Sequence, residues 1–166
     1  MKKLVIVGAG GYGQTVADIT NDIYDKIIFL DDNSKFAVGR CDEWSNYLND
    51  YDIYPAFGNN ELRLKFIERI LTMGGSVPTI IHNTAYVSPT AKINMGTVVL
   101  PKAVIGTNAE VEKGCIVNYG AIIDHGNVIG EGTHVCLAAV IKAENRIPRL
   151  SKIEAGEVIE NRTYPL

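Results

Sequence analysis

Residues 99–123 read VLPKAVIGTNAEVEKGCIVNYGAII, and within this stretch every sixth residue is valine or isoleucine. The same spacing continues in both directions without a slip. It covers Ile81, Val87, Ile93, Val99, Ile105, Val111, Val117, Ile123, Ile129, Val135, Ile141, Ile147, Ile153 and Ile159. An α-helix cannot keep residues six apart on one face, and simple strand alternation does not need a fixed unit of six. This period is typical of a parallel β-helix, whose repeats stack around one continuous core.

A small residue follows most of these branched residues by four positions. The set comprises Ala85, Ala91, Thr97, Ala103, Ala109, Cys115, Ala121, Thr133, Ala139 and Ser151. We expect each hexad to form one short strand and one corner. The branched residue should point inward from the strand and the small one inward near the corner, where little room remains. Three hexads would close one triangular coil of about 18 residues. Such coils wind left-handed, as an exception to the right-handed crossover rule.

Composition describes an ordinary globular chain. Of the 166 residues 46% are hydrophobic and 21% are charged, and the formal net charge is −3. A net charge of −3 does not indicate the basic surface that binds nucleic acid. No apolar run reaches the roughly 18 residues of a membrane helix. We therefore expect no nucleic-acid partner and no membrane insertion. The cysteines Cys41, Cys115 and Cys136 form no closely spaced pair, which favours a reducing, cytoplasmic location.

The first part of the chain has the pattern of a mononucleotide-binding β-α-β unit. An apolar strand over 3–7 precedes the turn Gly8-Ala9-Gly10-Gly11-Tyr12-Gly13, a helical pattern runs to about Asp22, and a strand over 26–30 ends in Asp31-Asp32. Glycines let a phosphate approach the backbone, a helix N-terminus favours its charge, and an acid after the second strand can accept from a ribose or base. We predict nucleotide binding by Gly10, Gly11, Tyr12, Gly13, Asp31 and Asp32. The alternative is a tight turn that holds no ligand.

The following segments complete a small Rossmann-like domain. We predict a short helix over 43–49, a strand over 52–57, and a helix over 61–73 that Asn60 caps and Gly74-Gly75 ends. The apolar face of that helix would comprise Leu62, Phe66, Ile70 and Leu71. This domain, residues 1–76, is too small for two mononucleotide halves, which disfavours a nicotinamide-dependent oxidoreductase. With a β-helix domain over 77–166, the predicted fold class is α/β plus β-solenoid.

Two histidines interrupt the outer surface of the repeats. His125 follows Asp124 after the inward Ile123, and His134 directly precedes the inward Val135. A solvated imidazole is the usual interpretation of a surface histidine, but the stretch around His125 is poor in charge and Asp124 adjoins it. The two histidines are nine residues apart, which is half a coil, so they lie on different sides of the triangle. They could share a site only across a subunit boundary, which favours an oligomer and argues against a metal site within one chain.

The motifs described above, and their order along the chain, resemble those of the PglD/NeuD group of nucleotide-sugar acetyltransferases. The similarity covers residues 3–142 and includes the glycine turn, the Leu-Asp-Asp after the second strand, the segment Phe57-Gly58-Asn59-Asn60 with Arg63, and the histidine pair. The resemblance implies a homotrimer with active sites between neighbouring coils. It implies that the N-terminal domain, with Gly58 among its binding residues, holds a UDP-amino sugar, and that acetyl-CoA is the co-substrate, without a metal. The catalytic histidine of the family falls on His125 and its acetyl-CoA contact on His134.

Two features depart from the family pattern. Family members usually carry an acidic residue directly after the catalytic histidine, where this chain has Gly126, so Asp124 is the acid left to assist His125. The family also continues for further hexads, whereas this shorter sequence ends at Leu166 after a charged run that suits a solenoid cap. The sequence predicts an acyl-CoA-dependent N- or O-acetyltransferase of a UDP-type sugar, with His125 as general base. The alternative is a non-catalytic nucleotide-sugar-binding trimer that has lost the CoA-binding coils.

Overall fold

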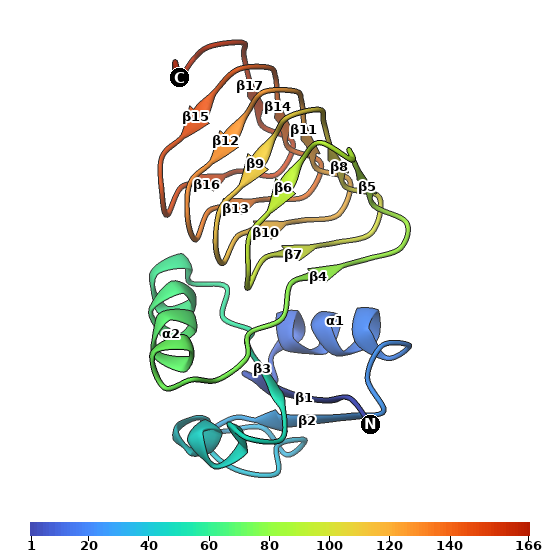
Figure 1. The fold of residues 1–166 in the computed structure, drawn as a ribbon, viewed down its shortest axis with the longest axis vertical. Helices are drawn as coiled ribbons and strands as arrows, with labels where there is room; N and C mark the ends of the chain where they lie inside the picture. Colours follow the sequence, from blue (N-terminus) through green and yellow to red (C-terminus); the bar gives the residue numbers. More distant parts are fainter. The chain divides into compact units, whose positions relative to one another are not determined.

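The computed structural model describes all of residues 1–166 and divides into two compact units, Met1–Pro78 and Thr79–Leu166. Figure 1 shows a small α/β unit in blue to green and a stack of coils in green to red. None of the helices has both the length and the apolar character needed to cross a membrane.

The first unit is a parallel sheet with helices. Its elements are β1 (Lys3–Val7), α1 (Gly11–Thr20), β2 (Lys26–Leu30), the 3₁₀ helix η1 (Cys41–Tyr47), β3 (Asp52–Pro55) and α2 (Asn60–Thr72). The strand order is β2-β1-β3, and both pairings are parallel. Trp44 of η1 and Ile67 and Ile70 of α2 join residues of all three strands in one buried cluster. Because the strands are parallel, their carboxyl ends meet at one edge of the sheet.

The beginning and the buried face of α2 differ from the sequence prediction. Asn59, not Asn60, caps the helix, since its side chain accepts a hydrogen bond from the Leu62 amide at 2.8 Å. The cap must have extended backbone, which Asn59 has. The buried residues of α2 are Arg63, Leu64, Ile67 and Ile70, while Leu62 is exposed. The apolar pattern alone misses this face because a buried arginine lies in its centre.

Two other boundaries in this unit also change. The segment predicted as a helix over 43–49 is the 3₁₀ helix over Cys41–Tyr47, and β3 ends at Pro55 instead of Phe57. The predicted end of α2 is confirmed. Gly74 has φ +80°, and the amides of Gly74 and Gly75 donate to the carbonyls of Leu71 and Ile70. This left-handed glycine ends the helix as expected.

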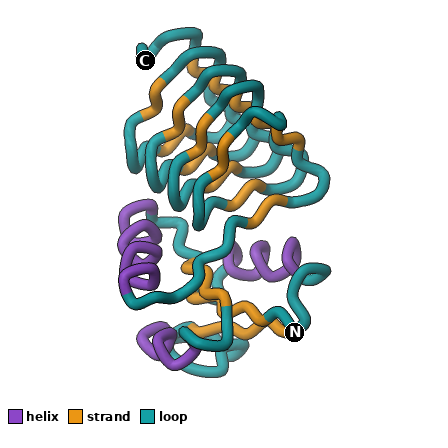
Figure 2. The backbone as a smooth tube through the Cα atoms, in the orientation of Figure 1, coloured by secondary structure: helices purple, strands orange, loops and turns teal.

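The second unit is built from two-residue strands that recur every six residues. They are β4 (Ile80–Ile81), β5 (Tyr86–Val87), β6 (Lys92–Ile93), β7 (Val98–Val99), β8 (Val104–Ile105), β9 (Glu110–Val111), β10 (Ile116–Val117), β11 (Ile122–Ile123), β12 (Val128–Ile129), β13 (His134–Val135), β14 (Val140–Ile141), β15 (Arg146–Ile147), β16 (Lys152–Ile153) and β17 (Val158–Ile159). Figure 2 shows these strands as short orange segments joined by loops at the corners.

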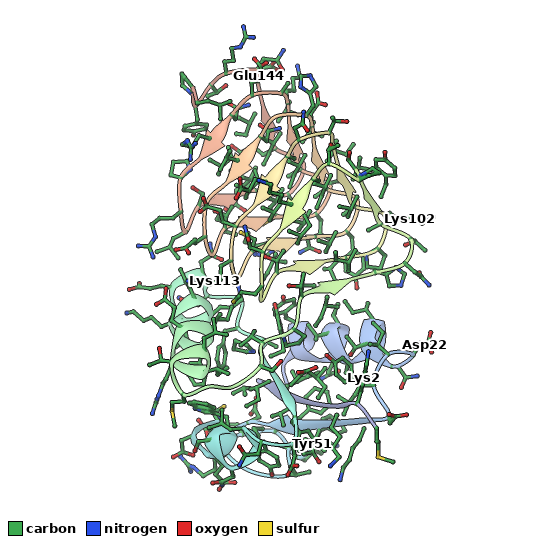
Figure 3. All side chains as sticks on the ribbon, in the orientation of Figure 1. Lys2, Asp22, Tyr51, Lys102, Lys113 and Glu144 are labelled. Carbon is green, nitrogen blue, oxygen red and sulfur yellow. The ribbon has the colours of Figure 1, made fainter.

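Strands three apart in sequence pair in parallel, which confirms three hexads per coil. The three sheets run β4-β7-β10-β13-β16, β5-β8-β11-β14-β17 and β6-β9-β12-β15. We call them the β4 sheet, the β5 sheet and the β6 sheet. In Figure 3, Lys102, Lys113 and Glu144 each lie at a different corner of the triangle. The α/β plus β-solenoid fold class is therefore confirmed.

The six-residue register fills the core of the coils as predicted. From Val99 to Ile159, every predicted inward Ile or Val is buried, and Ala103, Ala109, Cys115, Ala121 and Ala139 are buried with them. Full burial of one such branched side chain contributes on the order of 1.5–3 kcal/mol, so a slipped register would be costly. The first three inward residues are less buried: Val87 and Ile93 are partly buried, and Ile81 has 40% of its surface exposed. They lie in β5, β6 and β4, the end strands of the three sheets, so a neighbouring coil covers each of them on one side only.

From β6 onward, each corner turns through a residue in the left-handed region. From Gly96 to Arg162, every sixth residue has a positive φ, including Gly120, Gly126 and Gly132 but also Lys102, Ala138 and Glu144. Glycine adopts this conformation without steric cost, whereas the other residues adopt it only because the coils on either side fix the backbone. The corner conformation is therefore set by the repeat and not by glycine alone.

Candidate functional site

The carboxyl edge of the first unit's sheet collects the residues predicted to bind a nucleotide. The glycine turn follows β1, Asp31 and Asp32 follow β2, and Gly58 lies shortly after β3. The Gly8 amide donates to the Leu30 carbonyl at 2.8 Å, and a Cβ added to Gly8 would lie 3.1 Å from the Ala56 carbonyl oxygen. The turn after β1 thus lies directly between the ends of its two neighbouring strands.

The glycines at this edge are of two kinds. A Cβ added to Gly13 would overlap the Gly8 carbonyl oxygen, so Gly13 lets α1 pack closely against the end of β1. A Cβ added to Gly10, Gly11 or Gly58 meets nothing within 4 Å, and none of the three has a positive φ. The packing and backbone of this unit therefore require Gly13 but give no reason for the other three glycines. A ligand that approaches the backbone closely would give one.

The amino end of α1 lies at the same edge, directly after the glycine turn. No side chain caps the helix at Gly10, and its first turn contains no acidic residue. Backbone N–H groups at such an end carry partial positive charge and accept an anion readily. The edge therefore combines a helix terminus with open glycines, as phosphate binding requires.

Asp31 stabilises the edge through backbone contacts. Its Oδ2 accepts from the Ala9 amide at 2.8 Å, and its Oδ1 accepts from the amides of Asn33 at 2.8 Å and Ser34 at 2.9 Å. The bond from Ala9, followed by the bond from Asn33, holds the pKa of this carboxyl below its ordinary value. The carboxylate thus ties the glycine turn to the loop after β2. Asp32 accepts from the Cys41 amide at 3.1 Å.

Tyr12 and Arg63 support the edge from inside the unit. The Tyr12 hydroxyl lies 2.6 Å from the Tyr54 hydroxyl, and burial, together with Tyr54, raises the pKa of Tyr12 well above its ordinary value. Arg63 is fully buried and donates to the Phe57 carbonyl at 2.9 Å and to Asn60 Oδ1 at 3.0 Å. The structure therefore turns the Tyr12 hydroxyl inward, and Arg63 fixes the loop that carries Gly58.

A pocket of about 370 Å³ opens beside the glycine turn. Its lining comprises Ala9, Gln14, Ala17, Asp18, Phe29 and Phe36. Gln14 Nε2 donates to the Ala9 carbonyl at 3.1 Å, so the wall nearest the turn is fixed. Phe29 and Phe36 offer aromatic faces of the kind on which a base can stack. The sequence pattern gave no indication of these two residues, because they follow no phosphate or ribose motif.

His125 lies in the second unit, at the corner between β11 and β12, and its side chain is exposed. Asp124 Oδ1 accepts from the backbone amide of His125 at 2.6 Å, so this carboxylate shapes the corner itself. Gly126 has φ +68° and is the left-handed residue of the corner. A Cβ on Gly126 would lie 3.5 Å from Cγ of Glu144, the residue at the same position one coil further on. The left-handed conformation favours glycine after His125 but does not require it, since Glu144 adopts the same conformation one coil further on.

His134 begins β13 in the β4 sheet and is half-buried. Its Nε2 lies 3.1 Å from Nδ2 of Asn118, while Oδ1 of Asn118 accepts from the Tyr119 amide at 2.8 Å. Since the amide oxygen is used in that way, the amide nitrogen is the donor to His134. Nε2 is therefore the acceptor, and a neutral His134 carries its proton on Nδ1.

His125 and His134 are not neighbours within one chain. The first follows a strand of the β5 sheet and the second lies in the β4 sheet, in agreement with their half-coil spacing. No group of three or more His, Cys, Asp or Glu side chains has a geometry that could hold a metal ion.

A small Rossmann-like unit followed by hexapeptide coils is an architecture that occurs in hexapeptide-repeat acetyltransferases. Residues 3–70 match the PglD N-terminal domain family. The acetyltransferase domain of PglB from Neisseria gonorrhoeae FA1090 superposes with a TM-score of 0.93 at 33% identity, covering 98% of this chain and 84% of that one. The same domain in complex with acetyl coenzyme A gives a TM-score of 0.92 at 33% identity, over 97% and 83% of the two chains. The chain belongs to the PglD-type family of nucleotide-sugar acetyltransferases.

Two further relatives extend this comparison. The UDP-N-acetylbacillosamine N-acetyltransferase of Bacillus subtilis (strain 168) is 32% identical over 114 residues, which cover 60% of this chain and 52% of the relative. The match thus spans about half the length of that protein. PerB from Caulobacter crescentus shares the fold, with a TM-score of 0.81 at 21% identity over 100% of this chain and 92% of its own.

Proposed function

We propose that this protein transfers the acetyl group of acetyl-CoA to an amine on a UDP-linked sugar. The observation that carries the proposal is the 33% identity to the PglB acetyltransferase domain across 98% of the chain. That domain has been observed with acetyl coenzyme A. The Bacillus subtilis relative is an N-acetyltransferase named for a UDP-sugar, which favours an amine over a hydroxyl and uridine over other nucleosides.

The carboxyl edge of the first unit would hold the nucleotide. Its diphosphate fits the open glycines Gly10, Gly11 and Gly58 and the uncapped end of α1, which supplies N–H donors. The base fits the adjoining pocket between Phe29 and Phe36. Asp31 and Tyr12 then act mainly by holding the edge in shape, because their polar atoms already have partners in the protein.

His125 would act as the general base. As the sugar amine attacks the thioester carbonyl, a C–N bond forms, the amine loses a proton to the imidazole, and the C–S bond breaks to release CoA. A neutral imidazole suits this role near neutral pH. Asp124 assists by fixing the backbone of the corner, and His134, oriented by Asn118, would contact acetyl-CoA. A donor beside the carbonyl oxygen would stabilise its developing charge.

The β5 sheet supports a homotrimer. Its outward column is apolar from end to end and comprises Tyr86, Val104, Ile122, Val140 and Val158. The outward column of the β6 sheet instead carries Lys92, Glu110, Val128 and Arg146. A continuous exposed apolar column indicates a protein interface.

A threefold axis facing the β5 sheet would also bring the two histidines together. The corner with His125 borders one edge of that sheet, and the corner with Asn118, the partner of His134, borders the other. Around the axis, one edge of each copy faces the opposite edge of the next, and such a head-to-tail contact closes into a ring. Each active site would then combine His125 of one copy with His134 of its neighbour.

The test is binding and turnover measured separately. We expect calorimetry to show binding of both a UDP-amino sugar and acetyl-CoA. We expect His125→Ala and His125→Asn to lower kcat about 10²–10⁴-fold while both affinities stay near those of the parent. His82→Ala is the matched control, because this ring lies in the same coils and already contacts Thr84 Oγ1 at 2.9 Å. A parent that binds the UDP-sugar but neither binds acetyl-CoA nor transfers its acetyl group would be a binding module and would overturn the proposal.

A further inference from the structure

We propose that Asn127 is the positioning residue for His125, holding the corner from inside the coil. This inference rests on the proposed role of His125 as the base. Asn127 is fully buried, four residues after the inward Ile123, at a position where most hexads have a small residue. A polar amide buried at that position is costly unless its hydrogen-bonding groups have partners there.

All polar atoms of the Asn127 side chain have partners. Its Nδ2 donates to the Asp124 carbonyl at 2.8 Å and to the Ile141 carbonyl at 3.3 Å, and its Oδ1 accepts from the Asn145 amide at 2.8 Å. Two of these bonds run to the next coil and resemble those of an ordinary ladder. The bond to Asp124 runs back within the same hexad, to the peptide group that joins Asp124 to His125.

Contacts with the neighbouring coils also restrain the backbone of this corner. The Glu144 amide donates to the His125 carbonyl at 3.2 Å, and the Gly126 amide donates to the Thr107 carbonyl at 2.9 Å. On the side of the preceding coil, a Cβ on Gly106 would lie only 2.9 Å from the His125 nitrogen. The backbone of His125 is thus held from both neighbouring coils, and Asn127 holds it from the inside. The imidazole itself is exposed.

Threonines at the equivalent inner position of other hexads have no hydrogen bond like the one from Asn127 to Asp124, which stays within its own hexad. Thr97 Oγ1 donates to the Glu112 carbonyl at 2.9 Å, and Thr133 Oγ1 donates to the Pro148 carbonyl at 3.2 Å, both in the next coil. Thr97 Oγ1 also accepts from the Cys115 amide at 3.2 Å. A threonine at position 127 would therefore keep the coil-to-coil bonds while losing the bond to Asp124.

Asn145 provides a matched control one coil away. Its Nδ2 donates to the Lys142 carbonyl at 2.8 Å and to the Glu160 carbonyl at 3.0 Å, and its Oδ1 accepts from the Tyr164 amide at 2.9 Å. It thus repeats the backward and forward bonds of Asn127 at a corner that carries Ala143 in place of a histidine. Replacing Asn145 leaves its backbone amide available to Asn127.

The experiment compares Asn127→Thr and Asn127→Ala with Asn145→Thr and Asn145→Ala. We expect both Asn127 variants to lower kcat about 10-fold or more with little change in KM, because small misplacement of a reacting group is costly. We expect the Asn145 variants to keep the parent kcat at a comparable loss of thermal stability. Parent-like kcat in Asn127→Ala, or an equal loss in Asn145→Ala, would overturn the proposal.

A second readout is independent of turnover. The chain has three histidines, so the ring resonances of His82, His125 and His134 can be assigned by single substitutions and followed by NMR. We expect the Asn127 variants to shift or broaden the His125 resonances alone, and the Asn145 variants to move none. If the parent proves inactive, the proposed function fails, yet this readout still decides the positioning role. Unchanged His125 resonances in Asn127→Ala would reject it.

Discussion

Glycine serves two separate purposes at the carboxyl edge of the N-terminal sheet. Gly13 is required by packing, because a Cβ there would overlap the Gly8 carbonyl oxygen, while Gly8 is required by its φ of +104°. Gly10 and Gly11 satisfy neither condition and face open space. The sequence motif cannot separate these roles, because all four residues belong to one glycine-rich turn. The structure gives a packing or backbone reason for Gly8 and Gly13 but none for Gly10 and Gly11, for which we propose the approach of a ligand.

This division predicts opposite outcomes for two alanine variants. Gly11→Ala should leave thermal stability equal to or slightly above that of the parent, since alanine is favoured in a helix. It should weaken UDP-sugar binding about 10-fold or more, because the added methyl occupies the approach to the backbone. Gly13→Ala should instead lower the melting temperature. Calorimetry and circular dichroism on both variants check this, and parent-like UDP-sugar affinity in Gly11→Ala would show that the turn holds no phosphate.

Among the elements, the loop after β2 depends on one ionised carboxylate. Asp31 accepts three backbone hydrogen bonds, and its pKa is lower in the folded protein than its ordinary value because of them. A group with a lowered folded pKa contributes stability that is present above its unfolded pKa. That contribution is lost as the pH falls through the folded pKa. The tie between the turn and the loop should therefore be intact at neutral pH and fail only in acid.

NMR titration of the Ala9 amide tests this tie. We expect its proton resonance to follow Asp31 with a midpoint below the ordinary aspartate pKa, and Asp31→Asn to abolish that titration. Asp32→Asn is the control, because Asp32 bonds the Cys41 amide and not Ala9. A midpoint at or above the ordinary value would mean that the hydrogen bonds from Ala9, Asn33 and Ser34 do not form in solution.

Regular elements were predictable and buried polar groups were not. The six-residue register places each strand of the coils, β4 to β17, correctly, because one inward Ile or Val per hexad is required wherever the core is continuous. Arg63 in α2, and Asn127 and Asn145 in the coils, are fully buried although their residue types are usually exposed. Their hydrogen-bond partners are mostly backbone groups contributed by other segments, which no local pattern reveals. Spacing also cannot distinguish the 3₁₀ helix η1 from an α-helix, because a single short stretch fits both periods.

The same limit applies to the candidate site. The glycine turn, Gly58, His125 and His134 follow from motifs, and the structure places each at a strand end or corner. It gives Asp31 and Asp124 backbone partners that the sequence could not show, because those bonds depend on how each loop folds back. Phe29 and Phe36 become visible as candidates only when the pocket beside Ala9 is formed.

At the scale of the whole molecule, the proposed homotrimer requires one face of the coil to contact another copy. The three sheets have similar cores but different outer columns. That of the β5 sheet is apolar, with Tyr86, Ile122 and Val158 exposed by 58%, 40% and 49%. The β6 sheet carries lysine, glutamate and arginine in its outer column. Burial of the apolar column would be favourable at roughly 25 cal/mol per Å², whereas a charged column would oppose association.

Ile122→Glu tests this assignment against Val128→Glu. The two residues lie one hexad apart, at the outward position of β11 in the β5 sheet and of β12 in the β6 sheet. We expect light scattering to give a trimer mass for the parent and for Val128→Glu, and a monomer mass for Ile122→Glu. The Ile122 variant should keep its folded circular dichroism spectrum, because the side chain points away from the core. It should also lose acetyl transfer, since His125 and His134 could no longer meet across a subunit boundary, while UDP-sugar binding to the N-terminal edge should persist. A trimeric Ile122→Glu would place the interface elsewhere, and a monomeric parent at micromolar concentration would reject the shared site.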